Sequence, residues 1–176
     1  PALEDPQSYT FLDVSQNNSR NLGQKHWDVL QWIMSQREQY DLRPVNCTKV
    51  YGGPSNRDIF GSIQDGVDKF CRDVIGGCAS ARFHRPPSGN GLSDVSQNSI
   101  RAVRKIETLV RFWQIQPMME LLSDREDDEA YLTAMQGENY VIYFPAGGTV
   151  KLDLTQYPDK KFGGKWINVS TGQWGD

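Results

Sequence analysis

Residues 44–77 decide the fold, and they read PVNCTKVYGGPSNRDIFGSIQDGVDKFCRDVIGG. The stretch opens with a buried-looking strand, Pro44 to Tyr51, after which glycine, proline and asparagine break the chain. Apolar residues then recur at three- and four-residue steps, the period of an amphipathic helix: Ile63, Val67, Phe70, Cys71 and Val74. Gly76 and Gly77 end this helix. The stretch is therefore one strand-helix unit.

The same unit lies on either side of this stretch. Upstream, Tyr9 to Ser15 reads as a strand, and a helix from His26 to about Gln39 has an apolar stripe of Trp27, Leu30, Ile33 and Met34. Downstream, a strand from Ala79 to Arg85 leads to a long helix with the stripe Ile100, Val103, Ile106, Val110 and Trp113. Three such units in series predict parallel strands joined by right-handed crossovers.

Charge and hydropathy exclude several classes of partner. The chain has 19 basic and 22 acidic side chains, a net charge of −3, and no Lys/Arg-rich run that would neutralise the phosphates of a duplex. The longest apolar runs, such as Tyr140 to Pro145, are far shorter than the roughly 20 residues that cross a bilayer. We predict neither a nucleic-acid partner nor a membrane span.

Cysteine and glycine spacing argues against a metal or a cofactor. Cys47, Cys71 and Cys78 form no CxxC pair and no metal-ligand pattern, so we interpret them as small core residues. The sequence Gly89-Asn90-Gly91 does not continue into the glycine-led helix that the dinucleotide fingerprint requires. We therefore predict no metal and no cofactor.

The pattern changes after an acidic run. Asp124 to Glu129 holds five carboxylates and one arginine, and we place a solvated linker at 123–129. Beyond it, Val150, Leu152 and Leu154 alternate with polar residues, the period of a strand with one wet face. We predict an antiparallel meander of four strands, at 131–135, 140–144, 149–155 and about 165–169. This segment is too small to stand alone, since even a 60-residue domain is marginal.

Chemistry is expected where the parallel strands end, because the carboxyl ends of such strands form the functional face of α/β folds. The candidate residues are Asp13, Asn46, Lys49, Tyr51, Arg82 and His84. Each has a structural alternative: Asp13 as a cap of the next loop, and Lys49 with Tyr51, on one side of a strand, as buried partners. We expect His26, at a helix start, to be a capping or surface residue. A glycosidase needs two carboxylates, and these strand ends offer one.

Three stretches resemble the last three βα units of the apiosidase-like TIM-barrel glycoside hydrolases: DVSQ at 13–16, PVNCTKVY at 44–51 and GGCASARFHRP at 76–86. Three later stretches are similar to the small β-sandwich, labelled collagen-binding, that follows such barrels: YVIYFPAGG at 140–148, VKLDL at 150–154 and WINVSTG at 166–172. The resemblance covers nearly the whole chain.

The resemblance implies an α/β fold class, the last three βα units of a TIM barrel, plus a small antiparallel β-sandwich. Residues 1–122 would be the C-terminal portion of the barrel, 123–129 the linker and 130–176 the sandwich. Both parts would be incomplete, because a barrel needs eight strands in about 250 residues. The remainder of the barrel would lie before Pro1 and the closing strand of the sandwich after Asp176. The resemblance also implies a secreted, extracellular or periplasmic protein.

The family pattern fails at one catalytic position. Members often carry a glutamate in an Asn-x-Glu-x-x-Tyr setting, and matching Asn46 and Tyr51 puts Thr48 there. A threonine cannot be the carboxylate nucleophile, so the catalytic residues stay unassigned. Either Asp13 or an acid on another strand takes the role, or the barrel is catalytically altered.

Three hypotheses follow. In the first, the chain is the C-terminal part of a glycoside hydrolase-like protein that acts on glycans, inactive by itself, and supplies pocket residues and an accessory sandwich. In the second, it is a non-catalytic module that binds carbohydrate or matrix, which Thr48 favours. In the third, it is a free-standing three-unit α/β domain with a β appendage.

Overall fold

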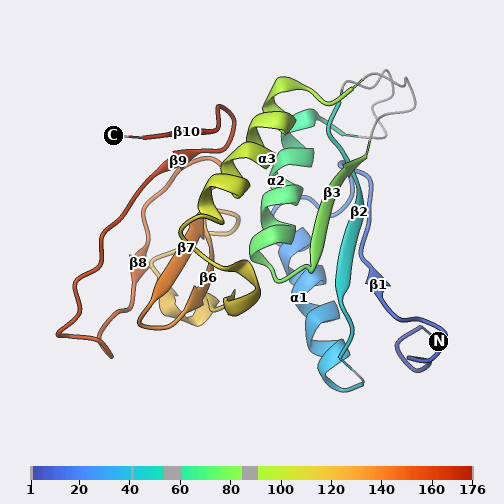
Figure 1. Ribbon diagram of the computed structural model, residues 1–176, viewed down its shortest axis with the longest axis horizontal. Coiled ribbons are helices and arrows are strands. Elements are labelled where there is room, and N and C mark those ends of the chain that lie inside the picture. Colours follow the sequence, from blue (N-terminus) through green and yellow to red (C-terminus); the bar gives the residue numbers. More distant parts are fainter. Residues whose placement is uncertain (1, 41, 54–60, 85–90, 176) are drawn as a thin grey trace.

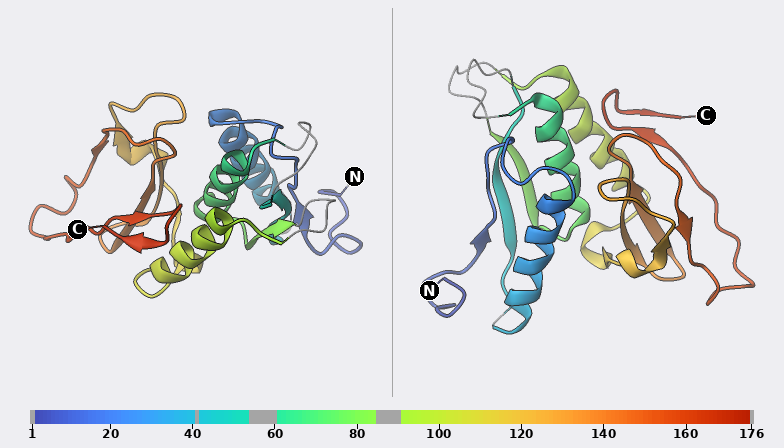
Figure 2. Two further views of the ribbon diagram at one scale, coloured as in Figure 1. Left: turned by 90° about the horizontal axis from the view of Figure 1, so that it is seen from above. Right: turned by 180° about the vertical axis from the view of Figure 1, so that it is seen from behind.

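The protein is described from a computed structural model, which places residues 2–40, 42–53, 61–84 and 91–175. It has three layers (Figure 1): a parallel sheet, a layer of helices, and small antiparallel sheets on the other side of the helices. Two further views show the same order, with the termini on opposite sides of the molecule (Figure 2). The fold is thus mixed α/β. No barrel is formed by the residues that the structure places.

The parallel sheet has the strand order β1-β2-β3, as the three strand-helix units predict. The strands are β1 (Leu12–Asp13), β2 (Val45–Tyr51) and β3 (Ser80–His84). β1 is shorter than predicted, because among the placed strands only β2 pairs with it. Backbone hydrogen bonds from Leu12 to Pro44 and from Val14 to Asn46, both 2.9 Å, hold β1 to β2.

Three α-helices lie in the described part of the chain: α1 (Gln24–Glu38), α2 (Ile63–Ile75) and α3 (Asp94–Ile106). Ser62 and Asp65 form a reciprocal capping box at the start of α2, and Ser93 caps α3. None of the helices is long and apolar enough to span a membrane.

The predicted third helix is wrong at its C-terminal end. α3 stops at Ile106, where a backbone hydrogen bond from Leu109 to Ile106 and the Thr108 hydroxyl on the Lys105 carbonyl tighten the last turn. Trp113, predicted to lie on the apolar stripe, falls in a separate 3-10 turn and is 78% exposed.

The main core lies between the parallel sheet and the helices α1 and α2. It combines the apolar stripes of both helices with the strand residues that face them, among them Leu12, Val14, Trp27, Leu30, Met34, Val45, Cys47, Val50, Val67, Phe70, Ile75 and Phe83. The rings of Phe70 and Phe83 stack at 4.6 Å and tie α2 to β3. Because the helices cover one face of the sheet, the opposite face is left to polar side chains.

The antiparallel strands form three small sheets instead of the predicted four-strand meander. One sheet has the order β4-β6-β7, with β4 (Gln116–Pro117), β6 (Tyr131–Met135) and β7 (Asn139–Tyr143). β5 (Leu122–Ser123) pairs with β8 (Lys151–Leu152), and β9 (Ile167–Asn168) pairs with β10 (Gln173–Trp174). The meander fails because β8 pairs with β5 instead of β7 or β9, and β9 pairs with β10, a strand outside the predicted set.

The acidic segment 123–129 contacts the helices. Asp128 accepts a hydrogen bond from Arg72 of α2 at 3.0 Å and another from the Tyr131 hydroxyl at 2.7 Å. Arg125 donates to the Ala130 carbonyl at 2.6 Å and also hydrogen-bonds to Gln24 of α1. The segment therefore fastens the antiparallel sheets to the helices. β4 precedes it, β5 ends at its first residue, Ser123, and both strands pair with strands beyond it.

Candidate functional site

The candidate site is the sheet face that the helices leave uncovered. Val45, Cys47 and Phe83 turn toward the helices and are buried. The strand positions between these, together with Ser15 after β1, lie on the uncovered face and are polar apart from one tyrosine. They are Asp13, Ser15, Asn46, Thr48, Lys49, Tyr51, Ser80, Arg82 and His84. We call this set the polar face.

The strand register aligns these residues in rows. Asp13 pairs with Asn46, which pairs with Ser80, so the three lie side by side across the sheet. The Ser80 hydroxyl donates to the Asn46 amide oxygen at 2.9 Å. Parallel strands end at the same edge, so residues far apart in sequence meet here.

Asp13 is the most constrained member of the polar face. The Ser15 amide donates to its Oδ1 at 2.7 Å, and the Thr48 hydroxyl donates to its Oδ2 at 2.5 Å. The Thr48 amide in turn donates to the Ser15 hydroxyl at 2.7 Å. Both carboxylate oxygens therefore have fixed partners.

These contacts keep Asp13 charged. Partial burial acts to raise the pKa of Asp13, but the hydrogen bonds from Ser15 and Thr48 outweigh it, and Arg82 adds an attractive charge. The net result is a pKa below the ordinary value, because hydrogen bonds to a carboxylate favour its ionised form. Asp13 is suited to accepting hydrogen bonds, and it is poorly suited to donating a proton.

A β-bulge in β2 shapes the remainder of the polar face. Cys47 pairs with Ala81 and Val50 with Phe83, so two residues, Thr48 and Lys49, lie opposite Arg82. A bulge of this kind redirects side chains and increases the local twist.

Beyond the bulge, three further side chains come together. The Lys49 ammonium lies 5.9 Å from the centre of the Tyr51 ring, and the His84 ring meets the Tyr51 ring edge-on at 5.6 Å. Arg82 reaches the Thr48 carbonyl with Nη2 at 3.5 Å. The structure therefore brings together the six predicted residues and Thr48.

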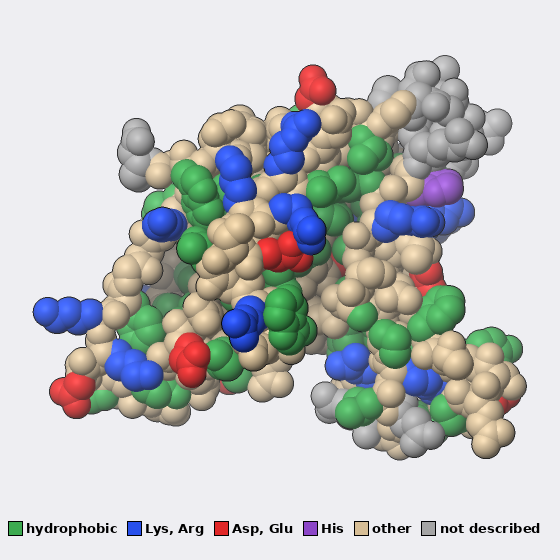
Figure 3. Space-filling view, viewed as in Figure 1, with side chains coloured by type: hydrophobic (Ala, Val, Ile, Leu, Met, Phe, Trp, Pro, Cys, Tyr) green, Lys and Arg blue, Asp and Glu red, His purple; other side chains and the backbone are tan. Residues whose placement is uncertain are grey.

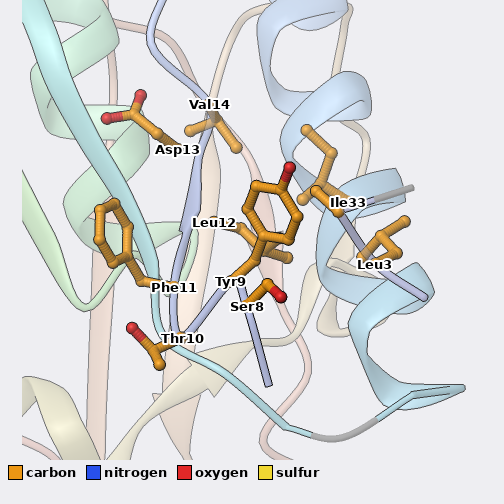
Figure 4. A pocket seen from close by; sticks show the side chains of 10 residues that line it. Leu3, Ser8, Tyr9, Thr10, Phe11, Leu12, Asp13, Val14 and Ile33 are labelled. Atoms are coloured by element: carbon orange, nitrogen blue, oxygen red, sulfur yellow. The ribbon is translucent and has the colours of Figure 1, made fainter. Parts of the chain in front are cut away.

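A groove runs along each of the two outer strands of the parallel sheet. Beside β1, a groove of about 430 Å³ is lined by apolar side chains that include Leu3, Tyr9 and Ile33 (Figure 4). Asp13 and Phe11 point to the other side of the strand. A groove of about 440 Å³ runs between β3 and α3, with Phe112 and Val103 in its wall.

Comparison with protein-family models, with curated proteins and with solved structures gave no match. Functional inference for this chain therefore rests on the geometry of its residues.

The chemistry available on the polar face is binding chemistry. Asp13 is its one carboxylate among the residues that the structure describes. No group of three histidine, cysteine or acidic side chains in the described ranges is placed to hold a metal ion. The loop residues Gly89 and Asn90, considered for nucleotide binding, lie outside the described residues. What remains is a set of hydroxyl, amide, carboxylate and cationic groups on one surface.

Sequence reasoning missed a buried polar cluster behind the sheet. His26, expected to be a capping or surface residue, is 4% exposed and lies 3.5 Å from Asp73, which is fully buried. Lys69, one turn before Asp73 on α2, and Arg72, the residue next to it, are buried as well. Lys69 donates to the Asn17 carbonyl at 3.0 Å and to the Arg20 carbonyl. The i, i+4 spacing of Lys69 and Asp73 was the available signal, but such pairs usually face solvent.

Burial sets the charge states in this cluster. Burial raises the pKa of Asp73 to about 7, although a Cys47 hydrogen bond and the charges of Lys69 and Arg72 act in the other direction. Burial, with Lys69 and Arg72, lowers the pKa of His26 to about 3, so its imidazole is neutral. Burial also raises the pKa of the Cys47 and Cys78 thiols. Cys47 and Cys71 are buried, as predicted for small core residues, whereas Cys78 is half-buried. We assign the cluster a structural role.

Proposed function

We propose that the polar face binds carbohydrate, and that the chain is the C-terminal part of a glycoside hydrolase-like protein acting on glycans. The observation that carries the proposal is the convergence of Asp13, Thr48 and Arg82 from three adjacent parallel strands. Sugar hydroxyls need fixed acceptors and donors, and Asp13 supplies an ionised acceptor whose orientation is locked by Ser15 and Thr48.

The role proposed for this chain is substrate positioning. A retaining glycosidase uses two carboxyl groups about 5 to 5.5 Å apart, and the polar face has one, Asp13, in its described part. Hydrolysis would therefore require an acid from another part of the protein. Asp13, Asn46, Lys49, Tyr51, Arg82 and His84 would then hold the glycan while that acid acts.

We further propose that additional βα units complete a TIM barrel around this sheet. Two observations support the idea. The outer edges of β1 and β3 have no partner among the placed strands, and each edge is flanked by a partly apolar groove. Exposed strand edges of this kind pair readily with further strands. The antiparallel sheets would be the accessory β-sandwich of the same protein, which would be secreted.

Binding should be tested first by titrating the protein with a panel of neutral and acidic oligosaccharides. We expect Asp13→Ala to weaken the best ligand at least tenfold, since it removes the oriented acceptor. Asp159→Ala, an exposed change in the loop between β8 and β9, is the matched control and should leave affinity unchanged. Equal affinity of the wild type and Asp13→Ala would refute the assignment of this face.

The second candidate function is a non-catalytic module that binds carbohydrate or matrix. It is favoured by Thr48, whose hydroxyl occupies the space next to Asp13 where the resemblance expects a carboxylate. Turnover of aryl glycosides should be compared between the protein and its Thr48→Glu variant. Native glycan binding with no turnover in either would favour the module, whereas native turnover would favour the hydrolase.

Thermal unfolding tests the proposal that further βα units complete a barrel around this sheet. A free-standing α/β domain predicts one cooperative transition for the 176-residue chain. A barrel segment with two open edges predicts a broad melt or aggregation. A sharp reversible transition of a monomer would count against the barrel, and it would leave the binding proposal intact.

A further inference from the structure

The polar face carries an excess of positive charge. Lys49 and Arg82 are exposed cations on this surface, and Asp13 is the one acid facing them in the described ranges. The imidazole of His84 adds a hydrogen-bonding group beside them. On the face shown in Figure 3, histidine (purple) lies beside Lys and Arg side chains (blue) at the upper right, where the parallel strands end.

This positive charge is offset only in part, by Asp13, and no neighbouring ion pair neutralises it. Among the residues that the structure places, neither Lys49 nor Arg82 lies within 4.0 Å of a carboxylate. Arg104 and Glu107, near Arg82 at the β3 groove, pair with each other at 2.6 Å and so add no net charge. The chain as a whole is acidic, with a net charge of −3, so the local excess runs against its overall balance.

The backbone fixes how these cations are displayed. The bulge places both Thr48 and Lys49 opposite Arg82. The cation of Lys49 therefore lies beside that of Arg82, where a regular strand would place a single residue. The Tyr51 ring, buried and in contact with both Lys49 and His84, separates the two side chains and supports them. The Lys49 ammonium lies 5.9 Å from the centre of the Tyr51 ring, a distance at which the ring quadrupole attracts a cation.

From this arrangement, and resting on the proposed carbohydrate function, we infer that the polar face selects saccharides carrying an anionic group, a carboxylate or a sulfate. The anionic group lies toward Lys49, Arg82 and His84. The sugar hydroxyls face Asp13 and Asn46, which are neighbours in the sheet register. Asp13 has its negative charge shared between two hydrogen-bond donors, so it repels the ligand less than a bare carboxylate would.

The test measures dissociation constants by calorimetry for three probes: a trisaccharide of β-1,4-linked glucuronic acid, its neutral glucose counterpart, and sodium sulfate. We expect the acidic trisaccharide to bind at least tenfold more tightly than the neutral one, with the difference shrinking as salt is added. Arg82→Gln and Lys49→Gln should each weaken binding of the acidic trisaccharide at least threefold more than binding of the neutral one. Lys161→Gln, an exposed change in the loop between β8 and β9, is the control and should have no effect.

The possible results distinguish the anionic preference from carbohydrate binding itself. If neither trisaccharide binds, the proposed carbohydrate function fails. If both bind equally, or if Arg82→Gln weakens both alike, carbohydrate binding stands and the anionic preference is overturned. Sulfate binding as tightly as the acidic trisaccharide also overturns the inference, because the sugar would then contribute nothing. Melting temperatures of the variants confirm that these exposed substitutions leave the fold unchanged.

Discussion

The hydroxyl of Thr48 on β2 donates a hydrogen bond of 2.5 Å to Oδ2 of Asp13 on β1, across 35 residues of sequence. This contact joins two adjacent parallel strands at the end where a binding site is expected. It also explains how Asp13 keeps a pKa below its ordinary value in spite of partial burial.

Replacing Thr48 with valine keeps the shape of the side chain and removes the donor. We expect Thr48→Val to raise the pKa of Asp13, because the ionised carboxylate loses one of its two hydrogen bonds to neighbours. Thr48→Ser, which retains the hydroxyl, should leave the pKa close to that of the wild type. NMR titration of the Asp13 carboxyl carbon measures both values, and identical titration curves for valine and threonine would contradict the assignment.

The same contact illustrates what the sequence could predict. Apolar spacing located the three helices, since α1 and α2 bury most of their predicted stripes and α3 packs Ile100 and Val103 against the core. Runs of β-branched and aromatic residues between chain breaks located the three parallel strands. The candidate residues could be chosen because parallel strands end at one edge. Their mutual contacts could not, since Thr48 and Lys49 look like ordinary strand residues and nothing in their order announces a bulge.

Other features depended on contacts distant in sequence. Lys69, Arg72 and Asp73 have the composition of a solvated helix face, and they are buried because α1, the loop after β1 and the segment 123–129 pack over α2. The partner of β8 is β5, on the other side of that segment, so the alternation of Val150 to Leu154 identified a strand and not its neighbour. Local patterns specify elements, and tertiary contacts decide what they pair with.

Asn18 fastens the loop after β1 to the end of β2. Its amide nitrogen donates to the Tyr51 carbonyl at 2.8 Å and to the Ser62 carbonyl at 2.9 Å, and its oxygen accepts from the Tyr51 amide at 2.8 Å. We expect Asn18→Ala to lower the free energy of unfolding by about 2–4 kcal/mol, since it leaves buried backbone groups unpaired. Urea denaturation measures the change.

The neighbouring Asn17 provides the control for that change. Its carbonyl receives Lys69, and Asn17→Ala keeps this carbonyl. We expect a loss below about 1 kcal/mol, as for substitutions away from a buried network. If Asn18→Ala lowered the free energy of unfolding as little as Asn17→Ala does, the three contacts of Asn18 would contribute little to stability.

The Arg72–Asp128 pair holds the antiparallel sheets against the helices. Arg72 is buried, Asp128 is 41% exposed, and Asp128 also accepts from the Tyr131 hydroxyl, whose ring lies 4.8 Å from that of Trp27. We expect Asp128→Ala to destabilise the protein by about 1–3 kcal/mol, because it leaves a buried guanidinium and a phenol with fewer partners. Asp127→Ala, one residue away and exposed, should cost less than about 0.5 kcal/mol. Chemical unfolding compares the two variants. An unchanged free energy of unfolding in Asp128→Ala would show that the Arg72–Asp128 pair does not hold the sheets against the helices.

The buried pair His26 and Asp73 should shape the pH dependence of stability in opposite directions. The folded pKa of His26 is lowered to about 3, so between pH 3 and 6.5 only the unfolded state binds its proton, and stability rises with pH. The folded pKa of Asp73 is raised to about 7, so between pH 4 and 7 only the folded state binds its proton, and stability falls with pH. The two slopes oppose each other in the wild type, so this pair contributes little net pH dependence to the stability between about pH 4 and 6.5.

Removing either group should reveal how the other makes the free energy of unfolding depend on pH. In His26→Gln the remaining Asp73 contribution makes stability fall as pH rises from 4 to 7, by at most about 1.4 kcal/mol per pH unit. In Asp73→Asn the remaining His26 contribution makes stability rise from pH 4 to 6.5. Urea unfolding at half-unit pH steps distinguishes the three proteins. Parallel curves for all of them would show that neither group changes its protonation on unfolding in this range, and that the burial of His26 and Asp73 has no consequence for their titration.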